Sequence, residues 1–185
     1  MSWIKEIEKE DAQGELKEIY DDIENKRGKL SNIMKVHSLN PSAMKSHMDL
    51  YYSIMFKDRS LSRKECEMIA VLVSKLNGCD YCITHHTEAL KAYWKDEEKL
   101  DDFVEDFRNV EIDDKMVTML EFVEKLTSEP GTVGKEDIEE LRTSGFDDKA
   151  ILNIDLVASY FNFVNRIALG LGVEFTEEEA SGYEY

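Results

Sequence analysis

The sequence has 185 residues, enough to bury a hydrophobic core within one domain. Its 40 acidic and 23 basic residues give a formal net charge of −17, which repels nucleic acid and anionic membranes, so we expect neither as a partner. No apolar run is long enough to cross a membrane, and the first residues lack the apolar core of a signal peptide. We therefore expect a cytoplasmic protein. In that reducing compartment a close cysteine pair is more often redox-active or metal-binding than structural.

The N-terminal part of the chain, residues 1–60, is predicted to contain two helices. The first covers about residues 14–25, where apolar residues recur with helical spacing. Residues 26–39 lack that periodicity and are expected to be loop or partly extended. The second helix begins at Asn40 and Pro41, because asparagine is a favoured N-cap and proline is tolerated in the first turn.

A helix over residues 62–76 is predicted to form the centre of the core. Ser62 and Glu65 have the spacing of a capping box at its start, and apolar residues occupy nearly every side of its later turns. Glu67 lies near the start of this apolar stretch, where a carboxylate must sit at the rim of the core or be buried with a partner. Gly78 then ends the helix and allows the chain to turn back.

The next predicted helix begins with two cysteines. Cys79 and Cys82 fall in its first turn, where free backbone N–H groups and the helix dipole stabilise a thiolate. At about 100° per residue, His86 lies on the same face as both cysteines, whereas His85 lies off that face. An antiparallel return from the preceding helix would place Glu67 near His86. We therefore expect these two cysteines, His86 and Glu67 to form one site.

The remainder of the sequence also has helical periodicity. Three helices are predicted between residues 96 and 143, followed by a long one from about Asp147 to Gly170. No segment alternates convincingly as a strand would, and there is no repeat. The sequence thus predicts an all-α, single-domain helical bundle. Its predicted parts are N-terminal helices over 1–60, a core with the cysteine pair over 61–173, and an acidic mobile tail over 174–185.

The residues alone leave three interpretations of the cysteine pair open. A redox pair needs two thiols that can close a disulfide and a group that activates one of them, which Cys79, Cys82 and His86 supply. A zinc site needs four ligands, and Glu67 could complete the set, so zinc is the secondary interpretation. The third is a pair of ordinary buried cysteines. Haem attachment is excluded because Ile83, and not a histidine, follows the second cysteine.

Beyond this spacing, the sequence resembles a known family. Glu67, the C-x-x-C motif and His86 are similar to the alkylhydroperoxidase (AhpD-like) branch of the carboxymuconolactone decarboxylase-like superfamily, above all to its peroxidase-related members. The resemblance extends to residues 32–41, 145–148, 162–166 and 171–173. It implies an all-helical fold, a homo-oligomer (dimer, trimer or hexamer), and turnover without haem, flavin or metal.

The resemblance also implies a role for each residue of the site. Cys82 would be the peroxidatic thiolate that becomes a sulfenic acid, and Cys79 would resolve it to a disulfide. His86 would move the proton, and Glu67 would orient its ring. The substrate would be an organic hydroperoxide or hydrogen peroxide, and a dithiol donor or small redox protein would reduce the disulfide. One departure is Tyr81, which stands where the best-known bacterial members have a histidine.

Two functions of other classes are also considered. The superfamily's lactone decarboxylases perform acid–base chemistry without a cysteine pair, and the presence of both cysteines argues against that activity here. A non-catalytic redox-sensing or zinc-binding oligomer would keep the cysteines without turning over peroxide. Metal analysis and a thiol count before and after exposure to peroxide distinguish these alternatives.

Several other residues are not expected to take part in the chemistry. Cys66 is interpreted as a buried, inert thiol. His37 and His47 stand alone in the sequence and are interpreted as structural or surface residues. Arg166, on an otherwise apolar helix, is expected to need a partner such as a carboxylate across a subunit interface.

Overall fold

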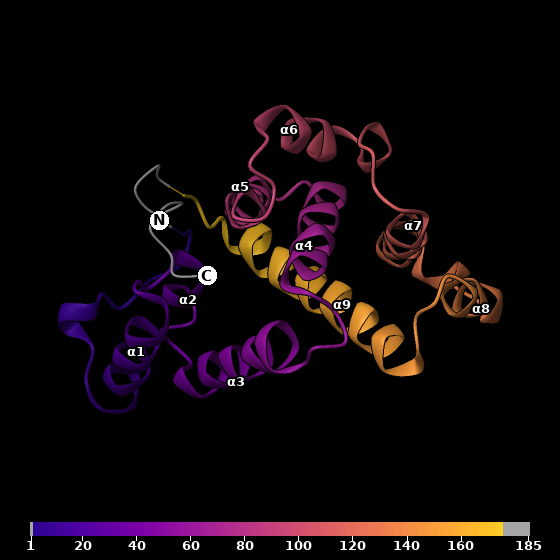
Figure 1. The fold of residues 1–185 in the computed structure, drawn as a ribbon. Helices are drawn as coiled ribbons and strands as arrows, with labels where there is room; N and C mark the ends of the chain where they lie inside the picture. The colour runs from indigo at the N-terminus through magenta and orange to yellow at the C-terminus, as the bar shows by residue number, and fades with distance from the viewer. Residues whose placement is uncertain (1, 176–185) are drawn as a thin grey trace.

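The computed structural model describes residues 2–175, and the secondary structure of this part is helical, with no β-strand (Figure 1). This confirms the predicted all-α fold. The helices are α1 (Gly14–Arg27), α2 (Asn32–Lys35), α3 (Pro41–Tyr52), α4 (Arg63–Asn77), α5 (Asp80–Lys91), α6 (Glu97–Glu105), α7 (Asp114–Ser128), α8 (Lys135–Thr143) and α9 (Asp148–Leu171). Short helical turns lie at Lys9–Asp11, Ser53–Lys57, Phe107–Asn109 and Pro130–Thr132.

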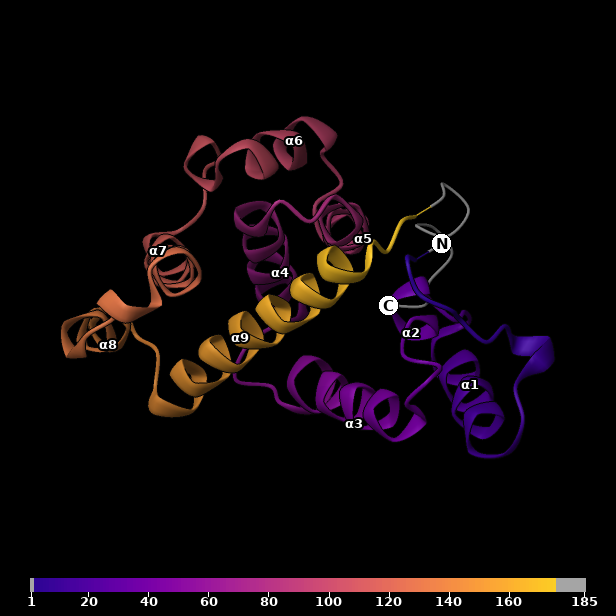
Figure 2. The same ribbon diagram turned by 180° about the vertical axis from the view of Figure 1, so that it is seen from behind.

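Helix α4 lies at the centre of the fold and packs against α5, α7 and α9 (Figures 1 and 2). Every residue from Cys66 to Ser74 is buried. The predicted capping box is present at its start, where the Ser62 hydroxyl accepts a hydrogen bond from the backbone N–H of Glu65 and the Glu65 carboxylate accepts one from that of Ser62. A helix that is apolar on nearly every side is stable only when neighbours cover it, and these three helices provide that cover.

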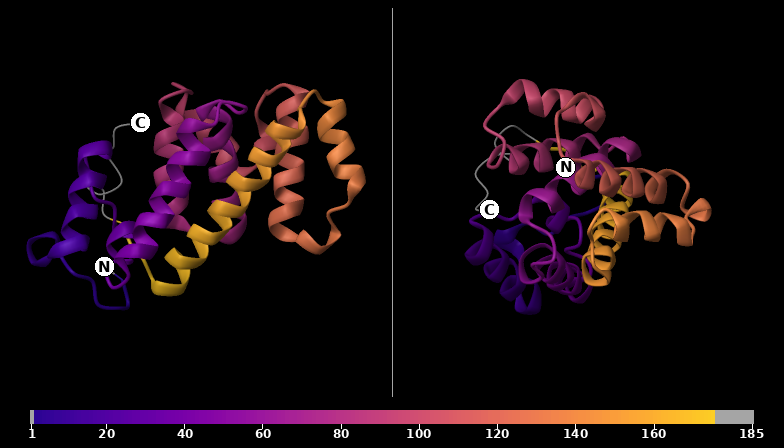
Figure 3. Two further views of the ribbon diagram at one scale, coloured as in Figure 1. Left: turned by 90° about the horizontal axis from the view of Figure 1, so that it is seen from below. Right: turned by 45° about the vertical axis from the view of Figure 1, so that its right-hand side comes forward.

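Helix α9 packs along one side of α4 and runs diagonally across the molecule, from the side of α8 to the side of α5 (Figure 2). Asp147 caps its start by accepting a hydrogen bond from the backbone N–H of Ala150. Helices α7 and α8 form a pair at one end of the molecule, and α1 and α2 lie at the other end (Figure 3). Because α3 also approaches α9, His47 of α3 meets Tyr160 and Phe163 of α9, which are far away in the sequence.

The turn between α4 and α5 determines which of their residues face each other. Gly78 has a φ of 66°, in the left-handed region that favours glycine, and the N–H of Cys79 donates to the carbonyl of Ser74 at 2.9 Å. The two helices are therefore joined through Gly78 and Cys79 alone, and they pack against each other. Across this pair of helices, Glu67 of α4 and His86 of α5 come within hydrogen-bond distance of each other.

The structure differs from the sequence prediction between residues 26 and 39. Helix α1 continues to Arg27, and the segment expected to be loop or extended contains the single-turn helix α2. Ile33 and Met34 of α2 are buried, so packing against the core stabilises a helix too short to show periodicity.

In the described part of the chain, no helix has the length and apolar character needed to span a membrane. The division of the chain into parts within one domain stays a prediction. Most of the predicted acidic tail, residues 176–185, lies outside the described residues.

Candidate functional site

The two cysteines of the C-x-x-C motif lie where the sequence predicts them, at the start of α5. Cys79 is the N-cap residue, and Cys82 follows in the first turn. They are joined by a disulfide, with a Cα–Cα distance of 5.3 Å, and both are almost fully buried. One turn of helix thus brings the two sulfur atoms within bonding reach, which is the geometric requirement for reversible disulfide chemistry.

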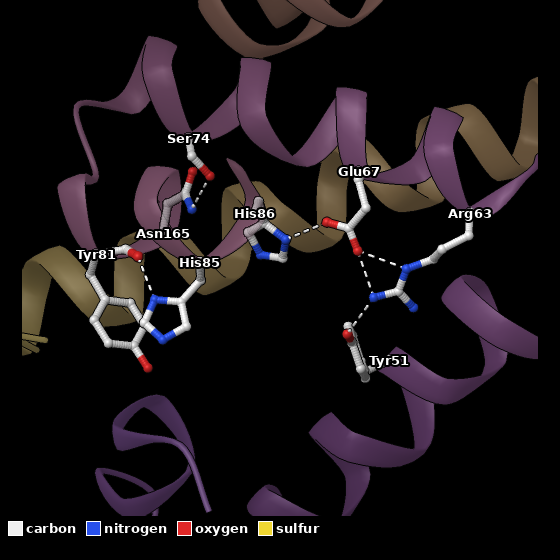
Figure 4. A network of polar contacts seen from close by, with 8 residues as sticks. All are labelled: Tyr51, Arg63, Glu67, Ser74, Tyr81, His85, His86 and Asn165. Atoms are coloured by element: carbon white, nitrogen blue, oxygen red, sulfur yellow. Dashed lines mark hydrogen bonds and ion pairs between the residues drawn. The ribbon is translucent and has the colours of Figure 1, made fainter. Parts of the chain in front are cut away.

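Glu67 of α4 and His86 of α5 form a direct hydrogen bond (Figure 4). His86 Nδ1 lies 2.7 Å from Glu67 Oε2, and the Glu67 side chain has no exposed surface. The prediction that an acid from the neighbouring helix meets His86 is therefore confirmed in its geometry. The rim position that the sequence left open for Glu67 is excluded.

Arg63 is a second partner of Glu67 and was not identified from the sequence. Its Nε donates to Glu67 Oε1 at 2.7 Å, and its Nη2 also donates to the hydroxyl of Tyr51 on α3 at 3.0 Å (Figure 4). Its guanidinium carbon lies 4.1 Å from the centre of the Phe56 ring. The signal available in the sequence was the i, i+4 spacing between Arg63 and Glu67, which is common on exposed helices and therefore weak evidence for a buried pair.

Burial and charge together set the protonation of this cluster. Burial alone would raise the pKa of Glu67, but His86 and Arg63 outweigh it, so the pKa of Glu67 lies below its usual value. Burial lowers the pKa of His86, and the attraction of Glu67 only partly offsets this. The cluster is thus an ionised Glu67 and a charged Arg63 beside a neutral His86 at pH 7.

The hydrogen bond to Glu67 also selects the tautomer of His86. A carboxylate can only accept, so Nδ1 carries the proton and Nε2 presents a lone pair. His86 is further held by Phe161 of α9, whose ring centre lies 4.5 Å from that of the imidazole in an edge-to-face arrangement. A neutral imidazole with a free Nε2 is able to accept a proton from a neighbouring acid.

Cys82 and His86 line the same small cavity, which has a volume of about 60 Å³. Its wall comes mainly from α2, α3, α5 and α9, with Arg27 at the end of α1 and Ser31 before α2 completing it. Apolar and aromatic side chains make up much of it, including Met34, Met48, Phe161 and Val164. Several of the groups that face the cavity are themselves buried, and electrostatic interactions between buried groups are stronger than in water.

His37 and His47, which stand alone in the sequence, are in contact in the folded chain. His47 is buried, and its Nε2 lies 2.7 Å from the hydroxyl of Tyr160 on α9. Its Nδ1 lies 3.3 Å from Nε2 of His37. The two histidines are ten residues apart, and the tyrosine is far away in the sequence, so only the approach of α3 to α9 brings them together. His47 and Tyr160 both line the cavity that contains Cys82.

His85 and Tyr81 form a separate pair on α5. His85 Nδ1 donates to the carbonyl of Tyr81 at 2.7 Å, and their ring centres lie 4.2 Å apart (Figure 4). The Tyr81 hydroxyl accepts a hydrogen bond from the N–H of Ile33. Tyr81 thus connects α5 to α2, while His86 and not His85 forms the hydrogen bond to Glu67 described above. This confirms that His86 is the histidine that pairs with the acid.

Three further residues have clear structural surroundings. Cys66 is buried, and burial raises the pKa of its thiol to about 12, as expected of an inert cysteine. Asn165 is buried and connects α9 to α4 by donating to Ser74 at 3.2 Å (Figure 4). Arg166 is exposed and donates to the carbonyl and side-chain oxygens of Asn162 on its own helix, so its polar partner lies within the chain.

The arrangement of potential metal ligands does not match the zinc interpretation. Within residues 2–175, no three histidine, cysteine or acidic side chains are grouped as ligands of one ion. Glu67 instead uses its two oxygens to bind His86 and Arg63. The donor set expected from the sequence is therefore engaged in hydrogen bonds and a disulfide.

Comparisons with known proteins match the part of the chain that carries this site. The model of the carboxymuconolactone decarboxylase family matches residues 41–106, a range that includes Glu67, both site cysteines and His86. The crystal structure of an uncharacterized peroxidase-related protein from Silicibacter sp. TM1040 has 30% sequence identity and a TM-score of 0.82, with 90% of this chain and 87% of that chain covered. An alkylhydroperoxidase AhpD core protein from Ralstonia eutropha JMP134, also described as peroxidase-related, has 25% identity and a TM-score of 0.87, with coverages of 97% and 94%.

A third solved structure shows the fold alone. The debrominase Bmp8, in complex with 2,3,4-tribromopyrrole, has 18% identity and a TM-score of 0.80 over 97% of this chain and 96% of its own. The same fold therefore occurs in a debrominase. On the family model and the 30% identical relative together, this chain belongs to the carboxymuconolactone decarboxylase family, among its AhpD-like members.

Proposed function

We propose that this chain is a thiol-dependent peroxidase that reduces hydroperoxides through a disulfide cycle of Cys79 and Cys82. The observation that carries the proposal is the hydrogen bond between buried Glu67 and His86, on the wall of the cavity that also contains Cys82. A structural cysteine pair has no need of a neutral, oriented imidazole. A thiol that must lose a proton has such a need.

The proposed reaction begins with the reduced cysteines. His86 Nε2 takes the proton of Cys82, and the resulting thiolate attacks the terminal oxygen of the hydroperoxide. The S–O bond forms as the O–O bond breaks, and the leaving alkoxide takes the proton from His86. Cys79 then attacks the sulfenic sulfur of Cys82, and water leaves as the disulfide forms.

The histidine contributes more as a proton carrier than by raising the thiolate population. Lowering a thiol pKa from about 8.5 to about 6 raises the thiolate fraction at pH 7 roughly 30-fold. Nucleophilicity falls by about 13-fold over the same change if the Brønsted slope for disulfide exchange applies, which leaves a net gain of about twofold. Protonating the leaving alkoxide is a larger effect, roughly 10²–10⁴-fold.

The cavity is consistent with a small peroxide head group. Its volume of about 60 Å³ is that of a few atoms, and the apolar side chains of Met34, Met48 and Val164 on its wall suit an organic substituent. Hydrogen peroxide and small organic hydroperoxides are therefore the proposed substrates. A bulky lipid hydroperoxide would need the cavity to widen.

A larger cavity lies on the side of Cys79 and supports a site for the reductant. It has a volume of about 470 Å³, and its wall includes Trp3, Cys79, Asp80 and Leu169. In the proposed cycle a donor thiolate attacks Cys79 and releases Cys82 as a thiolate. The second thiol of the donor then closes the donor's own disulfide and frees Cys79.

The test is consumption of hydrogen peroxide and cumene hydroperoxide in the presence of a panel of dithiols. We expect multiple turnovers by the wild type and none above background by Cys82→Ser. The matched control is Cys66→Ser, which removes the buried third thiol and should match the wild type. In Cys79→Ser, a dimedone-type probe should label Cys82 as the sulfenic acid.

Two results would contradict the proposal. Consumption of only one equivalent of peroxide with every donor would indicate a redox sensor. A stable sulfenic adduct only on Cys79, found in Cys82→Ser, would reverse the roles of the two cysteines.

A further inference from the structure

The hydrogen bonds that join His37, His47 and Tyr160 have no role in the steps above, yet they end at the reaction cavity. His47 and Tyr160 are both buried, and both line the cavity with Cys82. His37 binds the carbonyl of Ile33 through Nδ1 at 2.8 Å. The connection therefore runs from a backbone carbonyl on α2, through two imidazoles, to a hydroxyl on α9.

The backbone carbonyl fixes the direction of every hydrogen bond in this series. A carbonyl can only accept, so Nδ1 of His37 carries a proton, and its Nε2 is an acceptor when the ring is neutral. Nδ1 of His47 must then donate to His37, which leaves Nε2 of His47 as an acceptor. The Tyr160 hydroxyl consequently donates its proton to His47 at 2.7 Å.

The protonation of these groups agrees with that direction. Burial, and to a smaller extent the neighbouring His37, lower the pKa of His47 to about 3, so His47 is neutral in the physiological range. The pKa of His37 is also below its ordinary value, chiefly because of burial. Burial raises the pKa of Tyr160 well above its ordinary value, so the phenol keeps its proton. A phenol whose proton is already given to His47 has only lone pairs left for other partners.

We propose that Tyr160 binds the O–H of the hydroperoxide through these lone pairs, and that His47 and His37 are positioning residues that hold it as an acceptor. This inference rests on the proposed peroxidase function and deepens it. The attacked oxygen of a hydroperoxide carries the only hydrogen of the peroxide group, and that hydrogen stays on the sulfenic acid that forms. An acceptor for this hydrogen therefore stabilises the bound hydroperoxide before the attack of the thiolate and the sulfenic acid after it.

Tyr160 and His86 together orient the peroxide, because each binds one of its two oxygens. Once His86 has taken the thiol proton, its Nε2–H becomes a donor toward the leaving oxygen. Tyr160 accepts from the other oxygen. The S–O bond forms, the O–O electron pair moves to the alkoxide, and His86 returns its proton there, while the proton shared with Tyr160 never leaves its oxygen. A dialkyl peroxide has no O–H to offer and is disfavoured.

The test compares two oxidants of the reduced cysteine pair. Tyr160→Phe keeps the ring that packs edge-to-face against His47 and Phe161 and removes only the oxygen. We expect disulfide formation driven by hydrogen peroxide or cumene hydroperoxide to slow by roughly 5- to 10-fold, the effect of one neutral hydrogen bond. Oxidation by diamide, which needs no peroxide O–H to be held, should stay within twofold of the wild type.

Further variants test the positioning role of His47 and provide a control. His47→Leu should slow the peroxide reaction by a similar factor, and the double variant with Tyr160→Phe should be no slower than either single one, because His47 acts through Tyr160. His47→Gln, which retains an acceptor for the hydroxyl, should recover part of the rate. Tyr52→Phe is the matched control, since it deletes a tyrosine hydroxyl that has no hydrogen-bond partner within residues 2–175 and belongs to a residue outside the wall of this cavity.

The outcomes separate the inference from the proposed function. If the wild type forms its disulfide with diamide but not with any peroxide, both are wrong. If the wild type reacts with peroxide and Tyr160→Phe reacts equally fast, only the inference is wrong. An equal slowing of the peroxide and diamide reactions would assign Tyr160 a purely structural role and would also overturn it.

Discussion

The Nδ1 atom of His86 lies 2.7 Å from Oε2 of Glu67, a carboxylate with no exposed surface. One oxygen of this carboxylate is directed to the imidazole and the other to Arg63 (Figure 4). The arrangement resembles an acid that orients a base rather than a pair of groups that share a titrating proton. The imidazole is left neutral, with Nε2 free.

Replacing His86 with glutamine should slow the oxidation of Cys82 by peroxide roughly 100-fold at pH 7, because neither thiol deprotonation nor alkoxide protonation is then assisted. Stopped-flow oxidation of the reduced protein measures this directly. The rate of the variant should rise with pH as free thiolate accumulates, more steeply than that of the wild type. A variant as fast as the wild type at pH 7 would show that His86 is not the proton carrier.

Replacing Glu67 with glutamine should slow the same reaction by roughly 10- to 100-fold. An amide can turn its NH₂ group toward Nδ1 of His86 and so favour the tautomer with the proton on Nε2, where the thiol proton must go. Glu67→Asp keeps the charge and should lose less. The measurement is the pseudo-first-order rate against peroxide concentration, and equal rates for Gln and Asp would argue against selection of the tautomer.

Replacing Arg63 with methionine should destabilise the fold by about 3–5 kcal/mol, because it removes one partner of a buried ion pair. It should also raise the pKa of His86, since the positive charge of Arg63 contributes to lowering it. Urea unfolding measures the first effect, and an NMR titration of the His86 ring protons measures the second. Arg63→Lys retains the charge and serves as the control. An unchanged histidine titration in Arg63→Met would contradict the electrostatic account.

Stability should fall as the pH falls from about 6.5. The folded protein holds His47, with its pKa of about 3, neutral, whereas an unfolded histidine takes up a proton near pH 6.5. The unfolded state thus binds more protons in that window, and the free energy of unfolding decreases by up to about 1.4 kcal/mol per pH unit for each such group.

His37 and His86, whose pKa values are also lowered, act in the same direction, and Glu67 does so at lower pH. Urea unfolding at pH 7, 6 and 5 measures the slope of the free energy of unfolding against pH. His47→Leu should reduce it by about one proton, and an identical slope in wild type and variant would refute the assignment.

Much of the candidate site could be predicted from local patterns. The capping box at Ser62 and the glycine at 78 determine where α4 begins and ends, so the position of the cysteines on the first turn of α5 followed directly. The preference for His86 over His85 came from helical periodicity alone. Arg63 was missed because its i, i+4 spacing from Glu67 does not reveal whether the pair is buried.

The sequence by itself determined the all-α class, the helix caps and the set of side chains that share a face of α5, because these depend on spacing within a few residues. Only the tertiary structure decided that Glu67 is fully buried, that Tyr51 completes its surroundings, and that His47 meets Tyr160. Those contacts depend on which helix faces pack together. That choice is made by the burial of apolar surface summed over the whole core, which no local pattern contains.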